Sequence, residues 1–235
     1  MKILSIVGSP RVNGNTHFLA QKCVEGMRKK GAEVEEIILR QLKIEPCLDC
    51  GQCHEDGICK LSDDFEELAV KMKSSDGLLF STPVYCFNVT GHLKCFMDRC
   101  HSFVFPAFHT GLEDKKVAVI ITSGFPMPPQ EGMNLDTHKI DPEVFFELDR
   151  KLRLSTGDTL RCLINPALPF DPTIDTLRTF YQFSAMIRAG FSGFLEVTGL
   201  GKNKDAVQHR SQELQKAEEL GMKFAETLRT VPVQA

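Results

Sequence analysis

Short apolar runs alternate with amphipathic stretches along the chain. Runs of this kind are typical of buried strands, and apolar residues three and four positions apart are typical of helices that cover a sheet. The pattern predicts strands over 2–7, 33–39, 77–82, 116–122 and 193–198. It predicts helices over about 16–30, 63–73, 90–100, 171–187 and 203–229. This alternation indicates an α/β protein with a doubly wound parallel sheet.

The short first crossover favours the strand order 2-1-3-4-5, the order of flavodoxin-like sheets. In such a sheet the order reverses between strands 1 and 3, and ligands bind at the carboxyl ends of these strands. Residues 124–170 interrupt the alternation, so we expect an insertion there. It is expected to act as a lid or an oligomer contact, or to be a peripheral decoration. The whole chain, 1–235, is expected to form one domain.

Composition and charge exclude several classes of protein. Lysine and arginine number 28 against 31 acidic residues, so the net charge of −3 gives no basic surface for nucleic acid or anionic lipid. No stretch reaches the ~18 apolar residues of a spanning helix, and the first segment lacks the features of a signal peptide. We therefore expect a cytoplasmic protein, in which the nine cysteines serve as free thiols, metal ligands or redox groups rather than disulfides.

Residues 8–16 (GSPRVNGNT) follow the first strand and lead directly into a helix. Small and polar residues let backbone amides point inward, and the hydroxyls of Ser9 and Thr16 can complete a phosphate cradle with the charge of Arg11. Neither GxxxxGK[ST] nor GxGxxG is present, which argues against an NTPase and a dinucleotide site. The alternative is a strand-to-helix turn that binds nothing.

Residues 81–91 (STPVYCFNVTG) form a second loop, after the third strand. Pro83 turns the backbone at the switch point, and Tyr85 and Phe87 can place rings beside a planar ligand. Ser123 and Gly124, after the fourth strand, would form a third wall of the same crevice. Alternatively, the aromatic residues only cover the end of the sheet.

A loop over 41–61 contains four of the cysteines in the spacing CxxCxxCx5C: Cys47, Cys50, Cys53 and Cys59. Three cysteines at every third position can wrap one compact cluster, and Gly51 and Gly57 supply turns. The first three match the bacterial ferredoxin run, whereas the fourth comes later than it does there. A [4Fe–4S] cluster is therefore favoured over zinc and over thiols without metal. The other five are interpreted as ordinary thiols: Cys23, Cys86, Cys95, Cys100 and Cys162.

The motifs GSPRxxGNT, TPVYxFN and LKxFMDR resemble those of the NADPH-dependent FMN reductase family, which has the flavodoxin-like fold. The resemblance covers about 1–124 and, more weakly, 171–230. It implies that the FMN phosphate is held by Ser9, Arg11, Asn15 and Thr16. It implies that the flavin ring is bordered by Pro83, Val84, Tyr85, Cys86, Phe87, Asn88, Ser123 and Gly124. It further implies a structural ion pair between Asp98 and Arg99.

The cysteine loop resembles that of the iron–sulfur flavoproteins, a branch of this family. This resemblance implies that Cys47, Cys50, Cys53 and Cys59 ligate a [4Fe–4S] cluster. It implies a homodimer or homotetramer in which one subunit's cluster approaches another's flavin. FMN would carry the chemistry without a catalytic side chain, moving electrons from NAD(P)H or a carrier protein to an acceptor. The alternatives are a cluster-free NAD(P)H-dependent FMN or quinone reductase, and a non-enzymatic flavin- or zinc-binding module.

Overall fold

The fold is built on a five-stranded parallel sheet with the order β2-β1-β3-β4-β5. A computed structural model describes residues 1–107, 110–124 and 173–229. The strands are β1 (Lys2–Val7), β2 (Glu33–Ile38), β3 (Gly77–Pro83), β4 (Lys116–Thr122) and β5 (Gly190–Val197). The predicted fold class and strand order are confirmed, because every pairing between neighbouring strands is parallel and β1 lies between β2 and β3.

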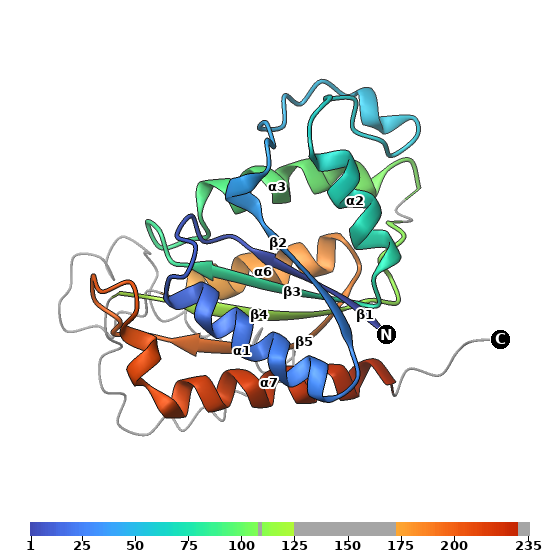
Figure 1. Cartoon of the computed structure of the whole chain (residues 1–235). Helices are drawn as coiled ribbons and strands as arrows, with labels where there is room; N and C mark the ends of the chain where they lie inside the picture. The colour runs from blue at the N-terminus through green and yellow to red at the C-terminus, as the bar shows by residue number, and fades with distance from the viewer. Residues whose placement is uncertain (108–109, 125–172, 230–235) are drawn as a thin grey trace, which may run out of the picture.

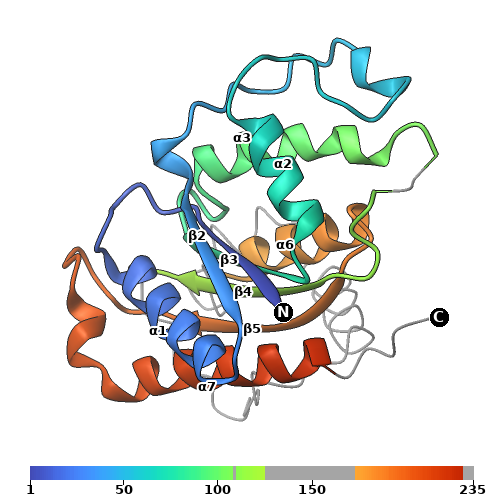
Figure 2. The same cartoon turned by 45° about the vertical axis from the view of Figure 1, so that its right-hand side comes forward.

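Helices cover both faces of the sheet (Figure 1 and Figure 2). On one face lie α1 (Asn15–Lys29) and α7 (Ser211–Arg229), which pack against each other and share a buried apolar cluster with the sheet. On the other face lie α2 (Phe65–Ser74), α3 (Gly91–Arg99) and α6 (Ile174–Met186), with a second buried cluster. Because both faces are covered, β1, β3 and β4 are nearly continuous apolar runs, as parallel sheets require.

Two predicted boundaries are wrong. Strand β5 begins at Gly190 rather than residue 193, because Gly190 continues the pairing with Lys116 at the start of β4. The last helix begins at Ser211 rather than 203, and a separate 3-10 turn, Ala206–His209, precedes it. The break lies at Arg210, whose backbone is not helical (φ −112°, ψ 78°) and whose guanidinium donates to the carbonyl oxygens of Thr198 and Gly199 at 2.8 and 2.5 Å. The 3-10 turn itself is held by Asn15, whose side-chain oxygen accepts from the Val207 amide at 3.0 Å.

Part of the expected organisation lies outside the described residues. These parts are the predicted insertion beyond Gly124, Cys162 within it, and residues 171–172, where the sequence predicts the start of a helix. Among the helices that the structure does describe, none has the length and apolar character needed to cross a bilayer.

Candidate functional site

The loop after β1 ends at an uncapped helix N-terminus. Gly14 is the N-cap of α1, no side chain caps the helix there, and its first turn has no acidic residue. The first amides of any helix have no partner within it and carry partial positive charge. The Ser9 hydroxyl accepts a hydrogen bond from the Arg11 amide at 3.2 Å, which folds the loop, and Arg11 itself is exposed. These groups fit a bound phosphate.

Asn15 and Thr16 brace this loop with their side chains. The Asn15 amide group donates to the carbonyl oxygen of Asn203 at 2.7 Å, and its own oxygen accepts from Val207. The Thr16 hydroxyl is buried and lies 2.7 Å from that of Thr122, at the end of β4. Both side chains are thus engaged in contacts within the protein.

His17 also shapes the loop after β1, although no motif in the sequence points to it. Asn13 has a positive φ of 56°, and its amide donates to Nδ1 of His17 at 2.9 Å. The other ring nitrogen, Nε2, lies 2.9 Å from a carboxylate oxygen of Glu36 in β2. Nδ1 therefore accepts and Nε2 carries the proton. The histidine is 3% exposed, so it links the loop to the neighbouring strand from within the protein.

Residues Tyr85 to Asn88 form a tight hairpin turn after β3. The Tyr85 amide donates to the Asn88 carbonyl at 2.8 Å, and the reverse bond is 3.0 Å long. The two central residues, Cys86 and Phe87, have φ of 48° and 63°. Two consecutive positive φ angles define the type I′ turn, which favours glycine and asparagine, so the backbone here is strained.

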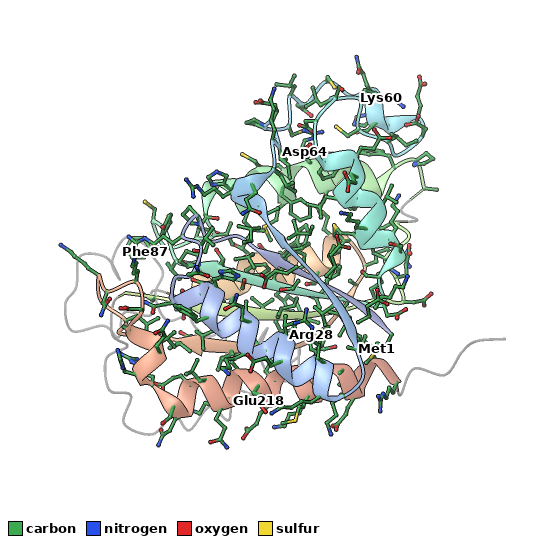
Figure 3. The ribbon with its side chains drawn as sticks, viewed as in Figure 1. Met1, Arg28, Lys60, Asp64, Phe87 and Glu218 are labelled. Atoms are coloured by element: carbon green, nitrogen blue, oxygen red, sulfur yellow. The ribbon has the colours of Figure 1, made fainter. Side chains whose placement is uncertain are left out.

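Helix α6 holds this turn, and the aromatic rings stay accessible. Thr179 donates to the Asn88 side-chain oxygen at 3.1 Å, and Thr176 donates to the Phe87 carbonyl at 3.4 Å. Tyr85 is 43% exposed and Phe87 is 40% exposed. Figure 3 shows Phe87 at the end of the sheet where β1 and β3 terminate. Exposed rings on a supported, strained turn are suited to contact a planar ligand.

The strain predicts an unusual result for Cys86→Gly. Relief of roughly 1–3 kcal/mol of backbone strain exceeds the roughly 0.5–1 kcal/mol of added chain entropy, so we expect stability to rise by about 1 kcal/mol. Cys95→Gly, in the middle of α3, is the matched control and should lower stability by about 1 kcal/mol. Urea unfolding measures both. Equal destabilisation by the two changes would show that the turn is unstrained.

The loops after β1, β3 and β4 are joined by hydrogen bonds. Thr90, the N-cap of α3, donates its hydroxyl to the Gly8 carbonyl at 2.6 Å and so connects the first two loops. The Val84 amide donates to the Thr122 carbonyl at 2.8 Å, which connects the second to the third. A Cβ at Gly124 would lie 2.9 Å from the carbonyl oxygen of Gly201. The structure thus brings the three predicted cofactor segments to one edge of the sheet.

The cysteine loop leaves the same edge after β2 but extends away from the cofactor segments, above α2 and α3 in Figure 1. Cys47 and Cys50 are exposed, and Cys53 and Cys59 are half-buried. Gly51 and Gly57 have φ of 70° and 72°, as expected for residues that provide turns. Across the described ranges, no three His, Cys, Asp or Glu side chains are gathered closely enough to hold a metal ion.

The second half of the loop packs against Phe105, in the segment that follows α3. The ring of His54 stacks on Phe105 with centroids 4.0 Å apart. A Cβ at Gly57 would lie 2.5 Å from the Phe105 carbonyl oxygen, so only glycine allows this close approach. In contrast, Leu48 in the first half is 67% exposed. Contacts with the rest of the protein therefore hold the half of the loop that contains Cys53 and Cys59 more firmly than the half that contains Cys47 and Cys50.

The predicted ion pair between Asp98 and Arg99 is wrong. Asp98 pairs with Lys94 on the helix surface, whereas Arg99 points inward and forms two hydrogen bonds with Asp63, of 2.6 and 3.1 Å. Consecutive residues of a helix do not face each other, which explains the error. Burial disfavours the Asp63 charge, but Arg99 and the amides of Glu45 and Phe65 outweigh it and hold the Asp63 pKa below its usual value.

The remaining thiols differ in their surroundings. Cys23 and Cys100 are fully buried, and burial raises the pKa of both. Cys95 is half-buried, and Cys86 is exposed on the strained turn. Within the described residues, the first two match the interpretation as small buried hydrophobic residues.

The chain is similar to known proteins in sequence and in fold. The model of the family "NADPH-dependent FMN reductase" matches residues 1–133. An iron–sulfur flavoprotein of Methanocaldococcus jannaschii is 40% identical over 99 residues, which are 42% of this chain and 51% of the relative. One from Methanosarcina thermophila is 33% identical over 99 residues, 42% of this chain and 52% of the relative. The match thus spans about half the length of these relatives.

Solved structures agree on the fold. A flavone reductase superposes with a TM-score of 0.63 at 19% identity, covering 100% of this chain and 65% of its own. An NAD(P)H:quinone oxidoreductase from Methanothermobacter marburgensis gives a TM-score of 0.61 at 13% identity, covering 95% of each chain. At these identities the likeness concerns the fold. The family model, however, matches 133 of the 235 residues, including the loops after β1 and β3, and the protein therefore belongs to the NADPH-dependent FMN reductase family.

Proposed function

We propose that the protein is an FMN-dependent oxidoreductase that moves electrons from a reduced donor, NAD(P)H or a carrier protein, to an acceptor. One observation carries the proposal: an uncapped helix N-terminus and an exposed aromatic turn meet at the switch point of the sheet, in a chain of the FMN reductase family. When bound, FMN supplies the transfer of hydride and of single electrons. The protein residues bind and orient it.

The phosphate and the ring of FMN would be held by different segments. The first amides of α1, the Ser9 hydroxyl and the exposed Arg11 guanidinium would hold the phosphate. The segments 83–88 and 123–124 would border the ring, with Tyr85 and Phe87 as its aromatic contacts. The hydrogen bonds from α6 to the turn would fix the position of these rings before the ligand binds.

Binding of FMN and riboflavin tests this division, because riboflavin lacks the phosphate. We expect Arg11→Gln to weaken FMN binding about tenfold, the value of one lost charge-assisted contact, and to leave riboflavin binding unchanged. Flavin fluorescence quenching of the flavin-free protein measures both. Lys22→Gln, on an exposed turn of α1, is the control. Equal affinity of the wild-type protein for the two flavins would refute the phosphate site.

We further propose that Cys47, Cys50, Cys53 and Cys59 bind a [4Fe–4S] cluster. Four thiols on one short loop form a suitable donor set for iron and sulfide. The half with Cys53 and Cys59 is already packed against Phe105 and Arg99. Cys47 and Cys50 are exposed, so the first half would close over the cluster during assembly. Such a cluster would exchange single electrons with the flavin.

Helix α3 separates the two proposed sites within one chain. It begins beside Thr90 at the flavin loop and ends at Arg99 beside Cys59. Nine residues of α-helix span about 13 Å. An assembly of two or four chains that brings one cysteine loop to the flavin edge of another chain would shorten this separation, and we propose such a homo-oligomer.

A cluster-free NAD(P)H-dependent FMN or quinone reductase is the second candidate. It is favoured by a relative from Bacillus subtilis, a putative NAD(P)H-dependent FMN-containing oxidoreductase, which is 33% identical over 128 residues. The same flavin edge would serve this function. Iron and sulfide assays on protein purified without oxygen separate the two candidates.

A further inference from the structure

A single buried guanidinium joins the two ends of the cysteine loop. Nη1 of Arg99 donates to the carbonyl oxygen of Glu45, before Cys47, at 2.9 Å. Nη2 donates to the carbonyl oxygen of Leu61, after Cys59, at 3.4 Å. Arg99 is 1% exposed. The loop is therefore closed at its base by a residue of α3, to which it is connected by hydrogen bonds rather than by sequence.

Asp63 fixes the orientation of this guanidinium. Its two carboxylate oxygens accept from Nη1 and Nη2 of Arg99 at 2.6 and 3.1 Å, and they also accept from the amides of Glu45 and Phe65. The ring of Phe65 lies 4.7 Å from the guanidinium carbon. A planar guanidinium held by a two-pronged carboxylate contact and an aromatic ring has one well-defined orientation.

The remaining donor of Arg99 points at a cysteine sulfur. Nε lies 3.1 Å from Sγ of Cys59. With this contact, all five N–H groups of the guanidinium have acceptors. Among the described residues, in contrast, the sulfur of Cys47 accepts only from a backbone amide, that of Asp49 at 3.5 Å on the exposed half of the loop. Cys59 thus differs from Cys47 in having a charged donor on its sulfur.

We propose that Arg99 is a positioning residue for Cys59, which holds this sulfur in place as a cluster ligand and raises the reduction potential of the cluster. The inference rests on the proposed function. A charged N–H donor stabilises negative charge on a ligating sulfur, and the reduced cluster is the more negative state. Hydrogen bonds to ligating atoms tune a metal site in this way. Asp63, the counter-charge of Arg99, moderates the effect.

Substitutions of Arg99 and of Asp63 are expected to shift the cluster potential in opposite directions. A merely structural role of this pair would not give opposite shifts. In Arg99→Lys the ammonium keeps the charge and can reach Asp63, but it cannot span Asp63 and Cys59 together. The cluster potential should therefore shift to a more negative value. In Asp63→Asn the Arg99 charge near the sulfur is no longer neutralised, so the potential should shift to a more positive value.

The experiment uses the full chain purified without oxygen, and an anaerobic redox titration followed by electron paramagnetic resonance measures the potential. Hydrogen exchange over 45–61 measures the closure of the loop and should rise at least tenfold in both variants. Arg28→Lys, an exposed arginine that donates to the Val34 carbonyl (Figure 3), is the control and should change neither quantity.

The outcomes separate this inference from the proposed function. Iron absent from the wild-type protein, with FMN present, would overturn the cluster itself. Iron present, with potentials that do not move or that move in the same direction in both variants, would overturn the role of Arg99 and leave the cluster intact. Opposite shifts, seen with slow exchange in the control, would support the proposal. If Arg99→Lys does not fold, Asp63→Asn alone tests the role of Arg99. A shift of the cluster potential to a more positive value supports this role, and an unchanged potential overturns it.

Discussion

Replacement of Gly221 by alanine should destabilise the protein by roughly 3 kcal/mol or more, at or beyond the upper end of measured overpacking effects. Gly221 lies where α7 crosses α1, and a Cβ there would be 1.9 Å from the carbonyl oxygen of Cys23. The crossing is reciprocal, since a Cβ at Gly26 would be 2.0 Å from the carbonyl oxygen of Glu218. Backbone atoms cannot give way, so the two helices would have to separate.

Separation of these helices would open the apolar cluster that they share with the sheet, which includes Met27 and Phe224. A loss of this size is a large share of a typical total stability of about 5–15 kcal/mol. Urea unfolding of the flavin-free protein measures it. Gly91→Ala is the matched control, because no atom lies within 4 Å of a Cβ at that helical position. Alanine favours helices, so this control should be neutral or slightly stabilising. A similar loss in both variants would contradict the close crossing.

Cys50→Ala should remove nearly all of the iron and leave FMN binding unchanged. A cluster that loses one of four thiolate ligands is no longer held by the loop, and the flavin edge lies at the other end of α3. Iron, sulfide and flavin assays on protein purified without oxygen measure both cofactors. Cys95→Ala, at a half-buried position of α3, is the control and should keep the iron. Iron retained at the wild-type level in Cys50→Ala would contradict the ligand assignment.

The sheet could be predicted from the sequence because its signals are local. Apolar runs bounded by Gly, Pro and polar residues define β1, β3 and β4 almost to the residue. The start of the last helix could not be predicted in this way. The separate turn that precedes it is held by Asn15, which accepts from the Val207 amide although the two residues are 192 positions apart. Periodicity contains no information about such a contact.

The candidate site shows the same difference between features that the sequence predicts and features that depend on distant contacts. The positions of the cofactor loops follow from topology alone, since they come after β1, β3 and β4, whose carboxyl ends share one edge. The hydrogen-bond partners of individual side chains do not follow from topology. Arg99 is 36 residues from Asp63 and 40 residues from Cys59, and the family resemblance suggested only the adjacent Asp98 as its partner. His17 is hidden for the same reason, because its partner Glu36 lies on β2.

The amounts of flavin, iron and sulfide per chain, measured after purification without oxygen, decide between the candidate functions. We expect about one FMN, and about four iron and four sulfide for one [4Fe–4S] cluster. FMN without iron would contradict the cluster and leave the cluster-free reductase. A colourless protein that binds no added FMN would contradict both the flavin site and the cluster.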